Sequence, residues 1–304
     1  MSRLEAALHR ATTGLVAEQP ERDGEQPERG LDPELLQVPD RTLVRQETRG
    51  PRRTSVVDSP VDEETLEFHF VGYNPSHAEK LIVSEKLPAS LREQYRRLGA
   101  MLHHAQAESG MKTLMISSAA PNEGKTLTAT NIALTLSESY QLRVLLIDGD
   151  LRRPSLAQIF QVPTVFGLSE ALTSEPERRV SLIQISKDLW LLPAGKPSPD
   201  PMSALTSGRM RRLLDEASAS FDWVIIDTPP VGILTDANLL GSIVDAAVLV
   251  VRAGKTPAVE VQRAVQAIGR EKILGVVLNR AERRHSSEAD SYYYASYYSS
   301  KRRS

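Results

Sequence analysis

The chain has 304 residues, a formal net charge of −2 and no cysteine. This length suits one large α/β domain with tails, and the near-neutral charge leaves no basic footprint, so we expect no nucleic-acid partner. The lack of cysteine excludes disulfides, thiolate metal sites and cysteine-ligated iron–sulfur clusters. No signal pattern opens the sequence and no apolar run approaches the roughly 18 residues of a membrane span, so a cytoplasmic protein is expected.

Residues 1–80 are expected to be a mostly disordered N-terminal segment. Apolar residues recur at helical spacing near the start, which predicts a short helix over 3–12. Residues 16–75 are rich in Pro, Glu, Arg, Gln and Asp, a composition typical of disorder. Two short stretches stand out near the end of this segment: residues 66–70 alternate like a docking strand, and residues 81–83 resemble an edge strand.

From 81 to 283 the sequence alternates between apolar runs and helix-favouring stretches, which indicates one domain. Helices are predicted over 90–104, 126–137, 154–160, 167–172 and 202–217, and again after residue 256, with Thr256 as N-cap and Pro257 at the first helical position. Strands are predicted over 113–116, 143–148, 189–192, 223–227, 246–251 and 273–278. Continuous apolar strands separated by helices indicate an α/β fold with a mostly parallel sheet covered on both faces.

The stretch 118–127, Ser-Ala-Ala-Pro-Asn-Glu-Gly-Lys-Thr-Leu, lies between a predicted strand and a predicted helix. That context predicts a phosphate-binding loop, because free N–H groups and the helix dipole favour an anion there. Lys125 would contact the β- and γ-phosphates and the Thr126 hydroxyl would ligate Mg²⁺. Ala119 stands where the full pattern has Gly, and Asn122 tolerates the positive φ that such loops need. The predicted nucleotide-binding residues of the loop are Ala120, Pro121, Asn122, Glu123, Gly124, Lys125, Thr126 and Leu127.

Two apolar strands end in acid. Asp148, followed by Asp150, closes one strand, and Asp227 closes another. Such an acid is often only a turn residue or a helix cap. Because ligands bind beyond the carboxyl ends of parallel strands, two acid-tipped strands beside a Gly-Lys-Thr loop predict a Mg²⁺–nucleotide site.

Residues 284–304 are polar and charged and are expected to form a flexible tail. The chain has eight tyrosines, of which five lie in this tail: Tyr292, Tyr293, Tyr294, Tyr297 and Tyr298. They fit either a low-complexity segment or a cluster of phosphoryl acceptors. The roughly 13 residues from Asn279 to Tyr292 span about 40 Å when extended, which is long enough to reach either a neighbour's nucleotide site or the chain's own.

Together, residues 118–127, 146–154, 224–230 and the tyrosine-rich tail resemble the bacterial tyrosine autokinases of capsule and exopolysaccharide synthesis, whose first three stretches are called Walker A, A′ and B. Residues 192–195, 250–256 and 275–279 also look like family segments. The resemblance implies a P-loop NTPase fold with a deviant Walker A, as in MinD and ParA. It also implies an ATP-dependent enzyme that transfers the γ-phosphoryl group to its own tail tyrosines in trans and thereby regulates polysaccharide synthesis and export.

The resemblance also implies roles for individual residues. Asp148 and Asp150 are expected to serve the metal site and to help activate the incoming tyrosine hydroxyl, and Asn279 is expected to contact the adenine. A carboxylate beside a phenol with a pKa near 10 suits this role, because it accepts the proton as transfer proceeds. The implied catalytic residues are Lys125, Asp148, Asp150 and Asp227. The implied metal ligands are Thr126, Asp148 and Asp227.

The family further implies partners: other copies of the chain in a ring-like oligomer, a membrane co-polymerase of the chain-length-determinant type that recruits the protein to the inner face of the plasma membrane, and a cognate tyrosine phosphatase. The family's oligomer-contact motif Glu-x-x-Arg-x-x-Arg is present only in part. Glu93 and Arg96 fit it, but Gly99 occupies the last position.

Two other functions remain open at this stage. A ParA- or MinD-like positioning ATPase has a signature lysine five residues before the catalytic one, where this chain has Ala120, and lacks a tyrosine tail. A nucleotide-binding module without catalysis, partnered with a membrane protein, is the second alternative. The full set of Lys125 and three aspartates favours catalysis over it.

Overall fold

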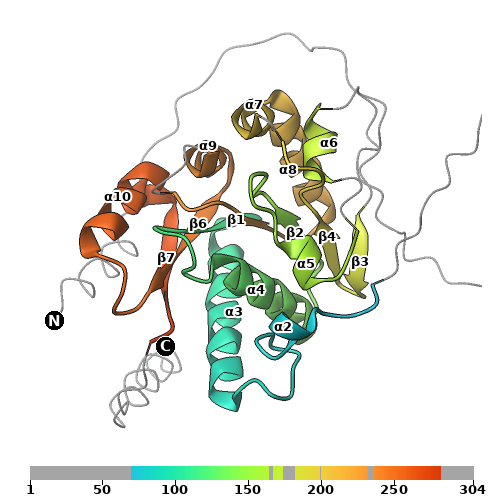
Figure 1. Cartoon of the computed structure of the whole chain (residues 1–304), viewed down its shortest axis with the longest axis vertical. Coiled ribbons are helices and arrows are strands. Elements are labelled where there is room, and N and C mark those ends of the chain that lie inside the picture. The colour runs from blue at the N-terminus through green and yellow to red at the C-terminus, as the bar shows by residue number, and fades with distance from the viewer. Residues whose placement is uncertain (1–69, 164–166, 174–181, 199, 232–235, 282–304) are drawn as a thin grey trace, which may run out of the picture.

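The computed structural model describes residues 70–163, 167–173, 182–198, 200–231 and 236–281. Within them a seven-stranded sheet has the order β3-β4-β2-β5-β1-β6-β7, and all neighbours are parallel except β3 and β4 (Figure 1). The strands are β1 (Thr113–Ser118), β2 (Val144–Asp148), β3 (Ile183–Ser186), β4 (Leu189–Leu192), β5 (Trp223–Asp227), β6 (Ala246–Arg252) and β7 (Ile273–Asn279).

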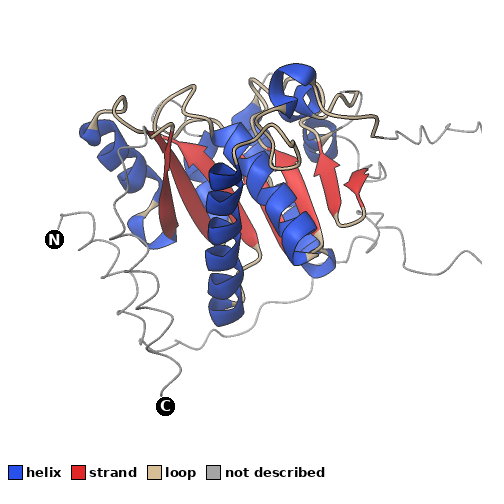
Figure 2. Ribbon diagram, turned by 90° about the horizontal axis from the view of Figure 1, so that it is seen from below, coloured by secondary structure: helices blue, strands red, loops and turns tan. Residues whose placement is uncertain are grey.

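Helices cover both faces of this sheet, as Figure 2 shows. One face carries α2 (Pro75–Ala78), α3 (Ala89–Ser109), α4 (Lys125–Tyr140) and α5 (Leu156–Ile159). The other carries α6 (Leu168–Thr173), α7 (Pro201–Thr206), α8 (Gly208–Ser220), α9 (Asp236–Ile243) and α10 (Ala258–Ile268), and a 3₁₀ turn at Arg270–Lys272 precedes β7. No helix in the described ranges is long and apolar enough to cross a membrane.

The central strands are buried along their whole length because their sequences are apolar on both faces. Every residue of β1, β2 and β5 is buried, which is the pattern of a parallel sheet between two helical layers. Helix α4 buries residues 128–137 between the sheet and α3. Gly99 of α3 permits this contact, because a Cβ there would lie 2.9 Å from Cε2 of Tyr140 and 3.0 Å from Cγ2 of Thr135.

The six strands predicted between residues 113 and 278 and the helices predicted from residue 90 onward are present, with shifted ends and one division. The single helix predicted over 202–217 is two helices, because Ser207 is extended (ψ 148°) and its hydroxyl oxygen accepts a hydrogen bond from Met210 N as the N-cap of α8. The antiparallel edge strand β3 and the helix α9 were not predicted.

The segment before α3 packs on the domain, although residues 1–80 were predicted to be mostly disordered. The edge strand predicted at residues 81–83 is wrong, since these residues form turns in which Leu81 and Ile82 are buried. Asn131 of α4 holds this part of the chain: its Oδ1 accepts from Ile82 N (2.9 Å) and its Nδ2 donates to Lys80 O (3.0 Å).

Packing begins as early as Phe70. The rings of Phe70 and Tyr73 contact Phe160 just after α5, and Asn74 N donates to Ile159 O at 2.9 Å. The segment from Phe70 to α3 therefore packs against α4 at Asn131 and against the end of α5. The helix predicted over 3–12, residues 66–69 of the predicted docking strand and the tyrosine tail at 284–304 lie outside the described residues.

Candidate nucleotide-binding site

The loop between β1 and α4 turns the chain through two left-handed residues. Asn122 has φ 62° and Gly124 has φ 96°, so the expectation that Asn122 adopts a positive φ is confirmed. Gly124 is required twice over, by its φ and because a Cβ would overlap the side-chain amide of Asn279. Helix α4 then begins at Lys125, with its first N–H groups facing the loop.

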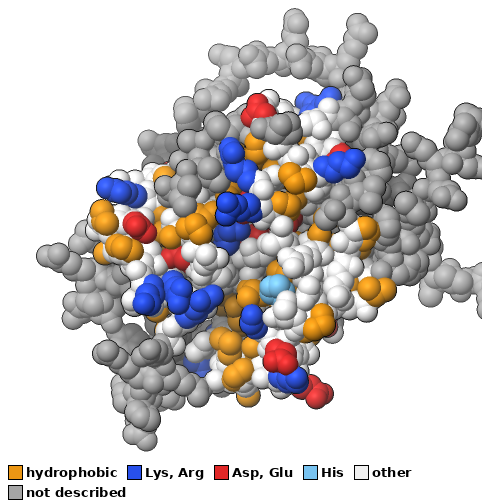
Figure 3. Space-filling view, in the orientation of Figure 1, with side chains coloured by type: hydrophobic (Ala, Val, Ile, Leu, Met, Phe, Trp, Pro, Cys, Tyr) orange, Lys and Arg blue, Asp and Glu red, His pale blue; other side chains and the backbone are white. Residues whose placement is uncertain are grey.

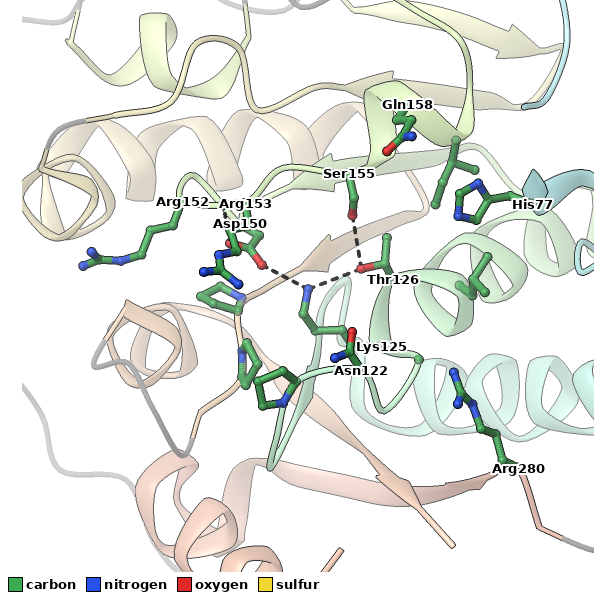
Figure 4. Close-up of a pocket in the computed structure, with 16 residues that line it drawn as sticks. His77, Asn122, Lys125, Thr126, Asp150, Arg152, Arg153, Ser155, Gln158 and Arg280 are labelled. Carbon is green, nitrogen blue, oxygen red and sulfur yellow. Dashed lines mark hydrogen bonds and ion pairs between the residues drawn. The ribbon is translucent and has the colours of Figure 1, made fainter. Parts of the chain in front are cut away.

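A pocket of about 620 Å³ opens over this helix N-terminus. It is lined by the loop, by the segment after β2, by Pro229 and Pro230 after β5, by His77 of α2 and by Arg280 after β7 (Figure 4). Lys and Arg side chains gather over the middle of one face of the molecule in Figure 3. Of the predicted residues, the pocket lining includes Pro121, Asn122, Gly124, Lys125, Thr126, Leu127 and Asp150.

Lys125 is the central cation of the pocket. Its Nζ lies 3.2 Å from Asp150 Oδ2, 3.5 Å from Asp227 Oδ1 and 3.3 Å from Thr126 Oγ1. Burial by itself lowers the pKa of Lys125, but the carboxylates of Asp227 and Asp150 outweigh it and raise that pKa. Lys125 therefore stays charged and lies where a phosphate chain would meet the helix N-terminus.

Asp148 lies at the end of β2 and directs its carboxylate to the backbone that follows. Its Oδ2 accepts from the N–H groups of Ser155 (3.0 Å) and Leu156 (2.9 Å), and its Oδ1 accepts from Asp150 N (3.2 Å). Burial, together with the charge of Asp227, raises the pKa of Asp148 to about 7. These contacts shape the loop that presents Asp150 to Lys125.

Asp227 is fully buried at the end of β5, and neither of its oxygens accepts a backbone hydrogen bond from a described residue, while Oδ1 is ion-paired with Lys125 Nζ at 3.5 Å. Burial raises the pKa of Asp227, while Lys125 opposes that rise. The described residues contain no group of three His, Cys, Asp or Glu that could hold a metal ion. Mg²⁺ needs no such group, since it is usually held by one or two carboxylates, phosphates and water, so Asp227 and the hydroxyl of Thr126 fit it.

Ala120, Glu123 and Asn279 were predicted to contact the nucleotide, but none of the three is part of the pocket lining. The Glu123 side chain is buried, and its Oε2 accepts from Ala120 N at 2.9 Å. Asn279 Nδ2 donates to the carbonyl oxygen of Glu123 at 2.8 Å. The side chains of Glu123 and Asn279 thus stabilise the loop from outside the pocket.

The turn after β6 meets the same carboxylate. Oε1 of Glu123 accepts from Arg252 N at 3.2 Å and from the hydroxyl of Thr256. The predicted N-cap role of Thr256 is therefore wrong: Pro257 occupies the N-cap of α10, which has no side-chain cap hydrogen bond.

Several residues that line the pocket were not predicted. Ser155 and Gln158 follow the strand that ends in Asp148, and Arg153 lies in a stretch that had been matched to the family, so their position was a usable signal. Arg280 directly follows Asn279 and has a left-handed backbone (φ 57°). His77 had no local signal, because it reaches the pocket only through the packing of the preceding segment on α5.

Residues 114–299 match the family model of the CobQ/CobB/MinD/ParA nucleotide binding domain, which is more than half of the chain. Fold, loop and pocket thus define a P-loop nucleotide-binding domain of the MinD and ParA type.

Comparison with individual proteins narrows this class. Tyrosine-protein kinase YwqD of Bacillus subtilis (strain 168) is 36% identical over 209 residues, which cover 67% of this chain and 87% of that protein. The kinase domain of Escherichia coli tyrosine kinase ETK has a TM-score of 0.62 and 32% identity, covering 74% of this chain and 88% of that one. The chimerical protein CapA2B2 has a TM-score of 0.63 and 33% identity, covering 67% and 91%. The chain belongs to the bacterial tyrosine-protein kinases, as its sequence predicted.

Proposed function

We propose that this chain is an ATP-dependent autokinase that transfers the γ-phosphoryl group to the tyrosines of its own residues 284–304. The catalytic domain then runs from about Phe70 to residue 283, and the tail supplies Tyr292, Tyr293, Tyr294, Tyr297 and Tyr298 as acceptors. The observation that carries the proposal is the position of Lys125, buried between Asp150 and Asp227 at the N-terminus of α4. Kinase relatives and the tyrosine cluster support the choice of acceptor.

The pocket supplies the groups that phosphoryl transfer needs. In the proposed reaction, the phenolic oxygen forms a bond to the γ-phosphorus while the bond from that phosphorus to the β–γ bridging oxygen breaks, and ADP leaves. Lys125 and the loop N–H groups neutralise charge on the phosphates, which together with positioning is most of what such catalysis requires. Asp150 lies in the pocket lining beside Lys125 and would take the phenolic proton.

Mg²⁺ would be held by Asp227 and Thr126 and would supply charge neutralisation at the phosphates. Asp148 was predicted as a further ligand. Its three backbone hydrogen bonds favour a supporting role, in which it fixes the loop that carries Asp150.

The test is incubation with labelled ATP and Mg²⁺, followed by mapping of the label. Wild type should be labelled on the tail, and the label should be lost in Lys125→Met and in a variant with the five tail tyrosines changed to Phe. Tyr140→Phe is a matched control, because this tyrosine lies in the domain and its hydroxyl bonds to Arg96 O. Wild type that binds ATP but gains no label would contradict the proposal.

Regulation of capsule or exopolysaccharide synthesis would follow from partners. We propose recruitment to the inner membrane face by a chain-length-determinant co-polymerase, reversal by a tyrosine phosphatase, and trans transfer within an oligomer. Gly99 does not support the family's contact motif at its last position, because it is packed against Tyr140 and Thr135. Stimulation of labelling by the cytoplasmic segment of such a co-polymerase tests the recruitment; an unchanged rate counts against it.

A further inference from the structure

The carboxylate of Glu123 joins the phosphate-binding loop to a distant turn. Glu123 is 2% exposed. One oxygen, Oε2, accepts from Ala120 N at the start of the loop at 2.9 Å. The other, Oε1, accepts from Arg252 N at 3.2 Å and from the hydroxyl of Thr256, which is 133 residues away in the sequence.

Three donors are what a buried carboxylate needs to offset its loss of water. Two of them belong to the turn after β6, and that turn is itself closed by a hydrogen bond from Thr256 N to Arg252 O at 3.2 Å. The third donor belongs to the loop. Glu123 therefore cannot keep its hydrogen bonds unless loop and turn hold their relative positions.

The loop depends on such a brace because its conformation is strained. Asn122 and Gly124, on either side of Glu123, both have positive φ. An L-residue such as Asn122 pays a cost in that region, and the conformation persists only when surrounding contacts enforce it. The hydrogen bond from Asn279 to the Glu123 carbonyl is a second restraint on the same residue.

We propose that Glu123 is a positioning residue for nucleotide binding and that Thr256, which lies outside the pocket, sets nucleotide affinity through it. This inference rests on the proposed function, because it assumes that ATP is the ligand of the loop. It differs from the sequence prediction, in which Glu123 touches the nucleotide. The turn from Arg252 to Thr256 would then affect nucleotide binding through Glu123, without contacting the nucleotide itself.

The experiment compares two variants of Thr256. Thr256→Ser keeps the hydroxyl, and Thr256→Val keeps the shape without a donor. A fluorescent ATP analogue with Mg²⁺ gives the dissociation constant, labelling gives kcat and KM for ATP, and thermal unfolding gives stability. Thr256→Val should weaken nucleotide binding about tenfold, the value of one hydrogen bond to a charged group. Its KM should rise with little change in kcat, and Thr256→Ser should stay within about twofold of wild type.

Glu123→Gln should weaken nucleotide binding more than Thr256→Val. The glutamine NH₂ group would replace one carboxylate oxygen and would face a backbone N–H, so that two donors would meet without an acceptor. Glu260→Gln, on the first turn of α10, is the matched control and should bind like wild type. If Thr256→Val does not fold, Thr256→Ala replaces it in the comparison with Thr256→Ser.

The outcomes separate the two hypotheses. Equal nucleotide affinity in Thr256→Val and Thr256→Ser, with a lower unfolding temperature in the former alone, would show a purely structural role and overturn the inference. Wild type that binds no nucleotide would instead overturn the proposed function itself.

Discussion

Two neighbouring strand ends carry the same residue in different surroundings. Asp148 of β2 and Asp227 of β5 are paired in register, and both are fully buried. Asp148 accepts three backbone hydrogen bonds, whereas neither oxygen of Asp227 accepts one from the described residues. One acid thus stabilises its own loop, and the other is available to a ligand.

The residues that follow each strand explain the difference. After Asp148 the chain turns back, so that the N–H groups of Ser155 and Leu156 at the start of α5 reach its carboxylate. After Asp227 come Pro229 and Pro230, which have no N–H to donate. The intervening Thr228 donates its N–H to Ile116 O instead. The contrast teaches that the backbone downstream of a strand-end acid decides whether it supports structure or serves a ligand.

The largest expected effect tests the ligand side of this contrast. Asp227→Asn should reduce autophosphorylation by about 10²–10³-fold, because it removes the carboxylate that is proposed to hold Mg²⁺ at the phosphates. The unfolding temperature should change little, since Asp227 accepts no backbone hydrogen bond and Lys125 keeps Asp150 as a partner. Phosphate incorporation from labelled ATP, with and without Mg²⁺, measures autophosphorylation. Thermal unfolding measures the unfolding temperature. Nearly wild-type activity in this variant would contradict the inference that Asp227 serves a ligand.

The next effect concerns stability and uses an identical change at both strand ends. Asp148→Ala leaves the N–H groups of Asp150, Ser155 and Leu156 without their acceptor, and should lower the free energy of unfolding by about 2–4 kcal/mol. Asp227→Ala leaves no backbone N–H without its acceptor, and Lys125 keeps Asp150 as a partner, so it should cost about 1 kcal/mol or less. Denaturant unfolding at pH 6 provides the measurement. Equal losses at the two positions would show that the hydrogen bonds of Asp148 do not distinguish it.

A pH series sharpens the same contrast. Burial raises the pKa of Asp148 from 3.8 to about 7, so the folded chain holds a proton that the unfolded chain has released. Stability should therefore fall as pH rises from 4 to 7, by up to about 1.4 kcal/mol per pH unit for this group, and level off above 7. Asp148→Asn cannot titrate and should show a shallower slope by that amount, while Asp227, whose pKa is also raised, still contributes. Parallel curves for the two proteins would contradict this assignment.

Local sequence pattern predicted the centre of the molecule well. The apolar runs that became β1, β2 and β5 are unambiguous, because a strand buried on both faces has few polar residues. Asn122 was predicted to tolerate positive φ, and it does. Lys125, Asp150 and Asp227 were expected to meet at the carboxyl end of the sheet, and the distances from Lys125 to both acids place them together.

Side-chain partners were beyond sequence reasoning. Asp148 and Asp227 look alike in the sequence, since both end an apolar strand, and only the path of the following backbone separates them. Thr256 fits a local capping rule, but the fold brings Glu123 close to it, and the Thr256 hydroxyl donates to the Glu123 carboxylate instead. β3 was missed because it is an edge strand of only four residues, which is too short for a clear pattern.

The smallest expected effect tests whether the segment after β2 contributes an oxygen that contacts Mg²⁺ or the phosphates. Ser155 lies in the pocket lining, and its hydroxyl is 3.5 Å from that of Thr126, while its N–H donates to Asp148. Ser155→Ala keeps that N–H, so stability should change by no more than about 0.5 kcal/mol and the pH slope should match wild type. Autophosphorylation should stay within about threefold, because only a long contact between neutral hydroxyls is lost.

Thr126→Ala is the matched control for Ser155→Ala, because it removes a hydroxyl from the ligand side of the same pair and should cost far more activity. A large loss in Ser155→Ala, with Mg²⁺ dependence altered, would mean that the segment after β2 contributes an oxygen to the metal or the phosphates. The two strand ends would then share the ligand, and the hydrogen bonds of Asp148 would serve to aim Ser155 as well as to hold the loop. Wild-type Mg²⁺ dependence in this variant would mean that Mg²⁺ and the phosphates are contacted by Thr126, Asp227 and Lys125 and not by Ser155.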